Sequence, residues 1–237
     1  MDSVVIVDAD SIYFRAAFIT KKKNEIRKII DETMLEIEGQ GVASQLQVAV
    51  KGHGNFRKDV FPAYKKNRKE LETDMRHALA YGHEYMKDRW EAVMADGMEA
   101  DDLVCIWAYE AREMEIPYLI AGIDKDLLQI PGNHYNFKRK DHTFVDDDTA
   151  SFNLFLQCPT GDSTDNIPGI KGIGPKKGEA ILKGVPPRRR WDRVRAAWRG
   201  HDAGCPKLSR RLLEMIKTWE EFDGICLLYT SPSPRDS

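Results

Sequence analysis

The stretch "SVVIVDAD" (Ser3–Asp10) is a short run of mostly β-branched apolar residues that ends in two carboxylates. A continuous apolar run of this length is typical of a strand buried on both faces, as in a parallel sheet. Three further stretches have the composition of strands of the same sheet: "QLQVAV" (45–50), "EAVMA" (91–95) and "IPYLIAG" (116–122). The first stretch therefore predicts a sheet at the centre of the fold.

Helical patterns separate these predicted strands. One is formed by Ile26, Ile30, Thr33 and Ile37, and another by Ala100, Leu103, Val104, Trp107, Ala108 and Ala111. Strands that alternate with helices predict an α/β domain with a mostly parallel sheet, whose ligands bind beyond the carboxyl ends of the strands. Six acids would lie at that edge of the sheet: Asp8, Glu99, Asp101, Asp102, Asp124 and Asp126.

The character of the chain changes after about residue 147, where short helices, glycine turns and basic residues follow. In "NIPGIKGIGPKKGEAIL" (166–182), three glycines allow a tight turn and Pro175 suits the first position of a helix. We therefore expect an α/β domain over 1–147 and a helical subdomain over 148–223. The Ser- and Pro-containing end, 224–237, predicts a disordered or non-native tail.

The composition is that of a globular protein, with 237 residues of which 42% are hydrophobic and 31% are charged. No apolar run approaches the roughly 18 residues of a membrane helix, and the N-terminus lacks the pattern of a signal peptide. We expect a cytoplasmic protein without a membrane partner. The four cysteines have no paired spacing, so neither a zinc site nor a disulfide framework is indicated.

Charge is segregated along the chain although the net charge is only -2. Lys51–Lys69 holds seven basic residues and one acid, and Lys176–Arg199 holds nine basic residues and two acids. Such a pattern can bind a polyanion while the acidic part of the chain holds cations. The alternative is that each basic run is a solvated face.

Acidic residues form four clusters. They are Asp8 with Asp10; Glu99, Asp101 and Asp102; Asp124 with Asp126; and Asp162 with Asp165. Divalent cations such as Mg²⁺ prefer oxygen ligands, and two-metal phosphodiester hydrolysis needs several carboxylates. Any one cluster can instead be a helix N-cap. Four clusters together favour the metal site, because their mutual repulsion requires neutralisation.

Two basic segments have compositions that suit nucleic acid. The glycine turn, which we define as residues 169–174, combines with lysines that can attract phosphate. Its candidate DNA-binding residues are Gly169, Lys171, Gly172, Gly174, Lys176 and Lys177. The alternative is a plain helix connection. The gateway segment, residues 55–70, interleaves basic residues with aromatic residues that can stack on bases, although Phe61 better suits a core position.

Five motifs occur in an order that resembles one known family: "VDAD", "FPAYKKNRK", "MEADDL", "IDKDLLQIPG" and "GDSTDNIPGIKGIGPKKGEAIL". They are similar to the motifs of the flap endonuclease superfamily, as in bacteriophage 5′-to-3′ exonucleases and the exonuclease domain of bacterial DNA polymerase I. The resemblance covers roughly residues 3–185. It implies a PIN-like α/β domain, a helix-three-turn-helix subdomain and a magnesium-dependent nuclease that acts on DNA with 5′ ends, flaps or nicks.

The resemblance also implies roles for individual residues. Ligands of a first metal would be Asp8, Glu99, Asp101 and Asp102, and ligands of a second would be Asp124, Asp126, Asp162 and Asp165. Lys65 and Arg68 would clamp the scissile phosphate, Tyr64 would stack on a base and Lys66 would contact DNA. Two Mg²⁺ ions are implied, with Mn²⁺ as a substitute and K⁺ at the glycine turn. RNA–DNA hybrid is a further implied substrate, and the expected state is a monomer.

One departure from the family pattern bears on activity. Family members usually have an aspartate at the end of the second strand, where this chain has Lys51, Gly52 and His53. The first metal site is then one carboxylate short, or another residue such as Asp10 completes it. Two alternatives stay open: a non-catalytic DNA-binding homologue, and a haloacid dehalogenase-type phosphatase in which Asp8 is the nucleophile and Asp10 the acid.

Overall fold

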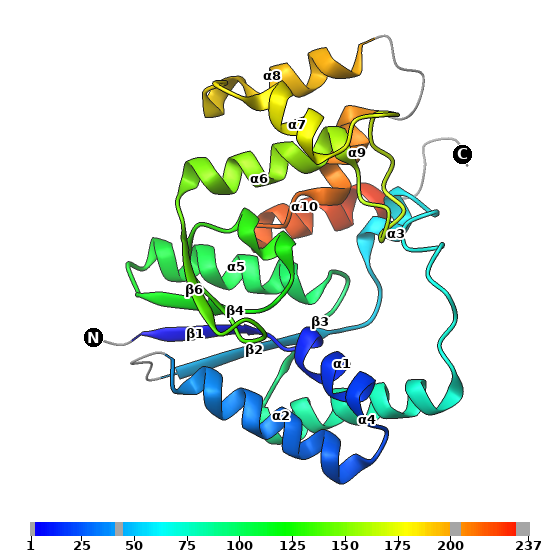
Figure 1. Cartoon of the computed structure of the whole chain (residues 1–237), viewed down its shortest axis with the longest axis vertical. Helices are drawn as coiled ribbons and strands as arrows, with labels where there is room; N and C mark the ends of the chain where they lie inside the picture. The colour runs from blue at the N-terminus through cyan, green and yellow to red at the C-terminus, as the bar shows by residue number, and fades with distance from the viewer. Residues whose placement is uncertain (1–2, 41–44, 200–204, 231–237) are drawn as a thin grey trace.

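The computed structural model describes residues 3–40, 45–199 and 205–230. A six-stranded sheet lies in the middle of the molecule, with helices on both faces and a helical group at one end (Figure 1). The strands are β1 (Val4–Asp8), β2 (Gln45–Lys51), β3 (Val93–Ala95), β4 (Tyr118–Ala121), β5 (Gly132–Asn136) and β6 (Asp141–Val145). Their order is β3-β2-β1-β4-β5-β6, and only β6 is antiparallel to its neighbour.

The helices follow the strands in alternation over the first part of the chain. They are α1 (Asp10–Ile19), α2 (Lys23–Glu38), α3 (Phe56–Val60), α4 (Thr73–Trp90), α5 (Ala100–Glu113), a 3₁₀ helix η1 (Lys125–Gln129), α6 (Asp147–Thr160), α7 (Pro175–Leu182), α8 (Pro187–Trp198), α9 (Pro206–Leu213) and α10 (Trp219–Thr230). This mostly parallel α/β arrangement confirms the fold class expected from the sequence.

The central strand β1 is buried on both faces, as its apolar run predicts. Val5 and Val7 contribute to the core shared with α1, α2 and α4, whereas Val4 and Ile6 contribute to the core shared with α5. Alternate residues of a strand point to opposite faces, so one continuous apolar run serves two cores. Figure 1 shows α1, α2 and α4 on one side of the sheet and α5 on the other.

The pair β5 and β6 was not predicted from the sequence. Its strands read "GNHYN" and "DHTFV", which contain no apolar run, and most of β6 is exposed. Phe144 of β6 is itself largely exposed. The strand β6 is an edge strand and has little hydrophobic signal, because only one side of it pairs and little of it is buried. The strand β5 pairs on both sides but buries only His134 and Tyr135, which do not make an apolar run.

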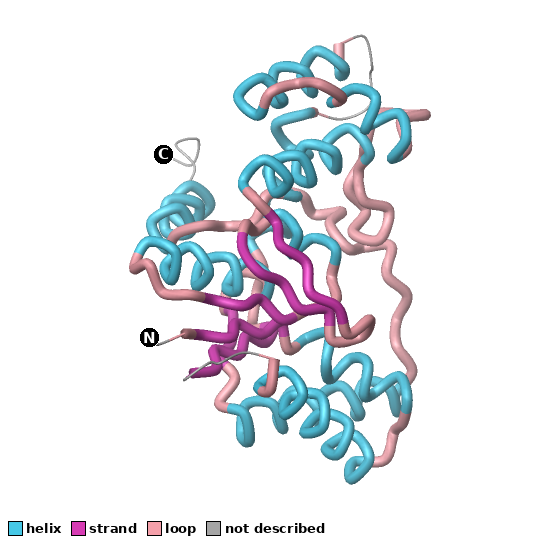
Figure 2. The backbone as a smooth tube through the Cα atoms, turned by 60° about the vertical axis from the view of Figure 1, so that its left-hand side comes forward, coloured by secondary structure: helices cyan, strands magenta, loops and turns pink. Residues whose placement is uncertain are grey.

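The helices α6, α7, α8 and α9 form the helical subdomain, which Figure 2 shows beyond the end of the sheet. Pro175 is the first residue of α7, as predicted. The core of this subdomain contains Leu154, Ile170, Val194 and Trp198 among its buried residues. The glycine turn lies between α6 and α7, so the expected helix, turn and helix are all present.

The disorder predicted for 224–237 is wrong over the first part of that segment, whereas its non-native origin stays a prediction. The helix α10 continues to Thr230, and Ile225 is buried in the core of the α/β domain together with Met215 and Ile216. The chain therefore leaves the helical subdomain before residue 223 and returns to the α/β domain. The helix formed by "WEEFDGICLL" packs on the α/β domain through a few apolar side chains, such as Ile225 and Phe222. The composition of the segment does not reveal these contacts. Residues 231–237 lie outside the described residues.

The gateway segment is not helical over most of its length. The helix α3 ends at Val60, and residues 62–67 form consecutive turns. Pro62 interrupts the segment, since proline lacks a backbone donor and restricts the residue before it.

Among the described residues, no helix is both long and apolar enough to cross a membrane.

Candidate active site

The carboxyl edge of the sheet opens into two adjoining cavities, which we call the acidic cleft. The larger has a volume of about 650 Å³ and the smaller about 140 Å³. Seven of the eight acids predicted as metal ligands line them: Asp8, Glu99, Asp101, Asp124, Asp126, Asp162 and Asp165. They come from the end of β1, the start of α5, the loop after β4 with the first turn of η1, and the loop after α6. The structure therefore brings together residues that are up to 157 positions apart, as between Asp8 and Asp165.

Two carboxylates at the floor of the cleft carry poorly compensated charge. Burial, with a further contribution from Asp10, raises the pKa of Asp8 to about 7. Burial, together with the charge of Glu99, raises the pKa of Asp101 well above its usual value. One side-chain oxygen of Asp101 is buried and has no hydrogen-bond partner. Buried oxygen donors that repel one another suit a bound divalent cation.

Basic side chains reach two other carboxylates of the cleft, Glu99 and Asp165. The Nζ atom of Lys65 contacts Glu99 and lies 3.5 Å from Asp165 Oδ2, and Arg68 Nη2 lies 2.5 Å from Asp165 Oδ1. Although burial opposes ionisation of Glu99, Arg57 and Lys65 hold its pKa below the usual value. Among the described residues, no group of three or more acidic, histidine or cysteine side chains is already arranged to hold a metal ion.

A further basic residue, Lys125, lines the smaller cavity of the cleft. Lys125 Nζ lies 3.0 Å from Asp162 Oδ2. Burial and then the charge of Asp124 raise the pKa of neighbouring Asp126 to about 6. Sequence reasoning missed Lys125, although it stands between the two acids of "DKD". The lysine pairs with Asp162 and also lowers the pKa of Asp126, although burial and Asp124 still keep that pKa above its usual value.

Asp102 does not face the cleft, contrary to what its place in "EADD" suggests. It is fully buried, and its carboxylate accepts hydrogen bonds from Arg57 at 2.5 and 2.8 Å and from the Ile216 amide at 3.1 Å. It also closes a capping box at the start of α5 with Glu99. Both oxygens are therefore occupied by the protein itself, and we leave Asp102 out of the proposed metal ligands.

Tyr64 is also placed differently from its expected role. Its side chain is only 3% exposed, and it packs in the core of the helical subdomain. Its hydroxyl donates to Glu99 Oε2 at 2.8 Å and to Asp165 Oδ2 at 3.1 Å. A ring held in this way is not available for base stacking, so the structure corrects that prediction. Phe61 is partly buried against the same core, as expected.

At the end of β2, where the family pattern has an aspartate, Gly52 is crowded by the Ala95 backbone and the Asp96 side chain. A Cβ atom on Gly52 would lie 2.5 Å from Asp96 Oδ1, so a side chain does not fit there. The carboxylate of Asp96 accepts the His53 backbone amide at 2.7 Å. Asp10 lines the acidic cleft and accepts the Lys51 amide at 2.8 Å. Asp10 thus anchors the strand end from which the family aspartate is missing.

The glycine turn is open to solvent at its tip. Gly172 has a φ of 80°, in the left-handed region, and no atom lies within 4 Å of the position of a Cβ there. By contrast, Gly169 packs against the Thr160 backbone, where a Cβ would come within 2.3 Å. The Nζ atom of Lys177 donates to the Gly172 carbonyl at 2.9 Å, and Lys171 and Lys176 are exposed, as is Lys66 of the gateway segment.

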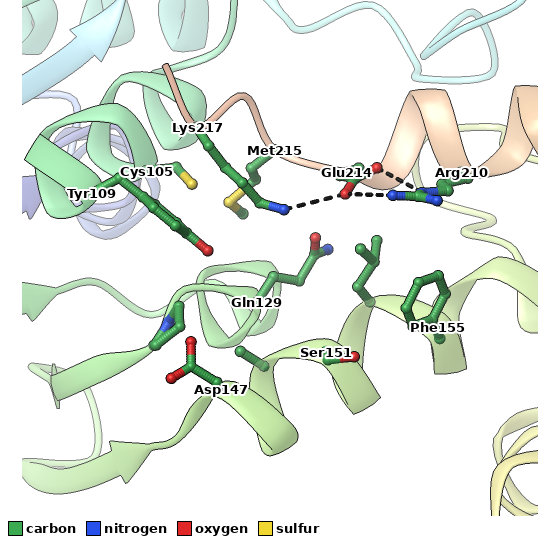
Figure 3. Close-up of a pocket in the computed structure, with 13 residues that line it drawn as sticks. Cys105, Tyr109, Gln129, Asp147, Ser151, Phe155, Arg210, Glu214, Met215 and Lys217 are labelled. Carbon is green, nitrogen blue, oxygen red and sulfur yellow. Dashed lines mark hydrogen bonds and ion pairs between the residues drawn. The ribbon is translucent and has the colours of Figure 1, made fainter. Parts of the chain in front are cut away.

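A separate cavity of about 180 Å³ lies between the two subdomains (Figure 3). Its charged side chains all form ion pairs. Glu214 contacts Arg210 at 2.7 Å and Lys217 at 3.3 Å. Asp147, at its opposite wall, pairs with Arg112 at 2.7 Å. Because these charges are already compensated, the cavity belongs to the packing between the subdomains, and the acidic cleft is the candidate site.

The parallel sheet with acids at its carboxyl edge, followed by the helical subdomain with its glycine turn, defines a PIN-like fold. The family model described as the 5'-3' exonuclease, N-terminal resolvase-like domain, matches residues 3–152. The chain therefore belongs to the 5'-3' exonuclease family.

Named relatives agree with this family. DNA polymerase I of Rhizobium leguminosarum is 33% identical over 138 residues, which are 54% of this chain and 14% of the polymerase. Flap endonuclease Xni of Shewanella sp. is 30% identical over 139 residues, which are 54% of this chain and 53% of that protein. The 5'-3' exonuclease of Mycoplasma pneumoniae is 27% identical over 210 residues, covering 77% of this chain and 72% of that protein.

A solved structure has the same fold. The crystal structure of the T5 D15 protein co-crystallized with metal ions matches with a TM-score of 0.68 at 20% identity, covering 96% of this chain and 98% of that chain. At this identity the likeness concerns the fold. The chain spans 14% of the polymerase and 53% of Xni, so it corresponds to only part of these relatives.

Proposed function

We propose that this chain is a metal-dependent nuclease that hydrolyses DNA phosphodiesters near 5′ ends, as a 5′-to-3′ exonuclease or flap endonuclease. The observation that carries the proposal is the meeting of seven carboxylates and the basic residues Lys65 and Arg68 in one cleft. A site with both signs of charge suits a polyanionic substrate and the cations that it needs. The DNA-related names of the relatives support the same substrate class.

The carboxylates divide between two proposed cation sites. Asp8, Glu99 and Asp101 would hold one Mg²⁺ with Asp10 in support, and the other would be held by Asp124, Asp126, Asp162 and Asp165. The donor set consists of oxygens alone, which fits Mg²⁺ or Mn²⁺ better than softer metals. Divalent cations there would supply Lewis-acid activation of the attacking water and of the leaving oxygen.

The protein's own side chains supply the remaining functions. Lys65 and Arg68 carry the positive charge that would offset charge developing on the phosphate. The exposed tip at Gly172, with Lys171 and Lys176 beside it, would hold the duplex through its phosphates, with K⁺ as a bridging ion. Lys66, which is exposed beside Lys65, would add a further phosphate contact. We also propose that the protein is a cytoplasmic monomer and that it accepts RNA–DNA hybrid as a substrate.

The test is cleavage of 5′-labelled flap, nicked and RNA–DNA hybrid substrates with Mg²⁺ or with a chelator. We expect release of short 5′-labelled products only with Mg²⁺. Asp124→Asn should abolish cleavage while DNA binding stays equal or becomes tighter, because the substitution removes negative charge that faces phosphate. Equal turnover by Asp124→Asn and the parent would remove this residue from the site.

The same experiment separates the two alternatives. Binding of flap DNA without Mg²⁺-dependent cleavage would establish the non-catalytic homologue, which the side-chain-free position of Gly52 favours. Trapping of a phosphoryl group on Asp8 would establish the phosphatase. That outcome is disfavoured, because a phosphatase mechanism built on Asp8 and Asp10 gives no role to Lys65, Arg68 or the glycine turn.

A further inference from the structure

Two short turns from distant parts of the sequence, residues 63–68 and 163–166, lie side by side at the acidic cleft. Figure 1 shows the chain after α3 beside the loop that precedes α7. Three hydrogen bonds to backbone carbonyls join the turns: Asn166 Nδ2 donates to the Ala63 carbonyl at 2.7 Å, Lys65 N donates to the Asp165 carbonyl at 2.9 Å, and Asn67 Nδ2 donates to the Ser163 carbonyl at 2.7 Å. The pairing runs in opposite directions along the two turns.

The two asparagines act reciprocally, since each turn contributes one side-chain amide that donates to a backbone carbonyl of the other. The Ala63 carbonyl also accepts the Lys66 amide at 3.1 Å within its own turn, so the Asn166 amide adds a second bond that ties the two turns together. Lys65 has a φ of 56° and Asn166 a φ of 59°, both in the left-handed region. Asparagine tolerates that region, whereas lysine adopts it at a cost that neighbouring contacts must offset.

The conformation of the first turn decides where its basic side chains lie. With Lys65 held as described, its Nζ atom reaches both Glu99 and Asp165, and Arg68 reaches Asp165 at 2.5 Å. The second turn leads directly into Ile167 and the glycine turn. If duplex binding changes the conformation of the glycine turn, the turn 163–166 would shift with it. The positions of Lys65 and Arg68 would then change as well.

We propose that Asn67 and Asn166 are positioning residues, which form a reciprocal amide clasp that couples the glycine turn to the placement of Lys65 and Arg68. The inference rests on the proposed nuclease function and adds a role for residues outside the cation sites. The clasp acts on the chemical step through the basic side chains. If the two asparagines only stabilise turns, their loss lowers stability and leaves the chemical step unchanged.

Asn67→Ala and Asn166→Ala are compared with Asn153→Ala, a matched control. Asn153 Nδ2 also donates to a backbone carbonyl, that of Leu128 at 2.8 Å, and it also joins α6 to the α/β domain. We expect each clasp variant to lower the single-turnover rate at saturating DNA by about 3- to 10-fold, the size expected from one net hydrogen bond. Affinity should change by less than about threefold, and the control rate by less than about twofold.

Asn166→Gly distinguishes loss of the side-chain amide from backbone strain. Glycine adopts a positive φ without strain, so this variant removes only the amide. If the bond to Ala63 matters, Asn166→Gly loses as much rate as Asn166→Ala. A rate for Asn166→Gly equal to that of the parent would overturn the role of this amide.

A mutant cycle tests whether the clasp acts through Lys65 and Arg68. In a background that carries both Lys65→Ala and Arg68→Ala, Asn67→Ala should have less than about a twofold further effect, since both side chains that it positions are gone. Full additivity of the two effects would overturn the coupling. Failure of the parent to cleave DNA would instead contradict the proposed function, so the two failures are distinguishable.

Limited trypsin digestion gives a readout that does not need activity. The clasp variants should be cut after Lys65, Lys66 or Arg68 about 3- to 10-fold faster than the parent, because the turn opens more often. Asn153→Ala should be cut there at the parental rate. Equal rates in all four proteins would mean that the asparagines do not hold the turn, and would overturn the inference.

Discussion

Lys65 and Arg68 converge on one carboxylate, Asp165, although they do not share a helix. If they stabilise charge that grows during hydrolysis, Lys65→Ala and Arg68→Ala should each lower the single-turnover rate at saturating DNA by roughly 10² or more. Binding should change far less. Rapid-quench measurement of that rate checks the prediction.

A solvated basic face predicts a different result for the same two variants. Each would weaken binding slightly and in a salt-dependent manner, with little change in the rate at saturation. Rates within about threefold of the parent for both variants would exclude the clamp role.

Asp8 allows a stability prediction at the same scale. Its pKa is about 7 in the folded protein, because of burial and Asp10, against an ordinary value of 3.8. A raised carboxyl pKa destabilises the fold as pH rises from about 4 to 7, since the unfolded chain releases the proton first. With chelator present, Asp8→Asn should therefore gain stability over the parent as pH rises, by roughly 1 to 4 kcal/mol at pH 7.

Urea unfolding of parent and Asp8→Asn at pH 4, 5.5 and 7 measures this difference. Added Mg²⁺ should reduce it at pH 7, because a bound cation stabilises the parent carboxylate. A stability difference that does not vary with pH would show that Asp8 ionises normally.

The glycine turn is the element on which binding should depend. Gly172 has a φ of 80° with open space at its Cβ position, so Gly172→Val is strained by the backbone and not by a clash. The turn should change shape and move its amides away from phosphate. We expect about a tenfold loss of affinity for duplex DNA of any sequence, measured by fluorescence anisotropy, with the α/β domain intact.

Gly184 offers a matched control for this substitution. It has a φ of 70° and open space at its Cβ position, but it follows α7 and lies outside the glycine turn. Gly184→Val should impose similar strain without the loss of affinity. Equal affinities for the two variants would indicate that the glycine turn is only a connector.

At the scale of the whole molecule, the buried pair of Arg57 and Asp102 holds the returning chain. Arg57 donates to the carbonyls of Leu212 and Glu214 at 2.8 and 3.3 Å, and Asp102 accepts the Ile216 amide at 3.1 Å. One ion pair thus links α3, α5 and the segment that re-enters the α/β domain.

Asp102→Asn would leave Arg57 buried without its countercharge. We expect a loss of about 3–5 kcal/mol in the free energy of unfolding, measured by denaturant titration. Asp147→Asn is the control, because Asp147 forms a similar two-bond pair with Arg112 but is largely exposed. Asp147→Asn should lower the free energy of unfolding by less than about 1 kcal/mol. Similar losses for both would contradict the structural role of the buried pair.

The sequence predicted those features that depend on the residue types of one short segment. The apolar run of β1 required burial on both faces, and the acids after β1 and β4 had to lie at one edge because parallel strands end together. The turn at Gly172 followed from the same local logic, since only glycine adopts its φ without cost.

Tertiary structure alone decided the features that depend on which side chains meet. The residue types of Asp102, Tyr64 and Asp96 are compatible with metal binding, base stacking or a surface position. Their surroundings instead assign Asp102 to Arg57, Tyr64 to the carboxylates of the cleft, and Asp96 to the space beside Gly52. The physical reason is that a hydrogen bond or ion pair between distant residues depends on the packing of whole elements, which leaves no periodic signal along the chain.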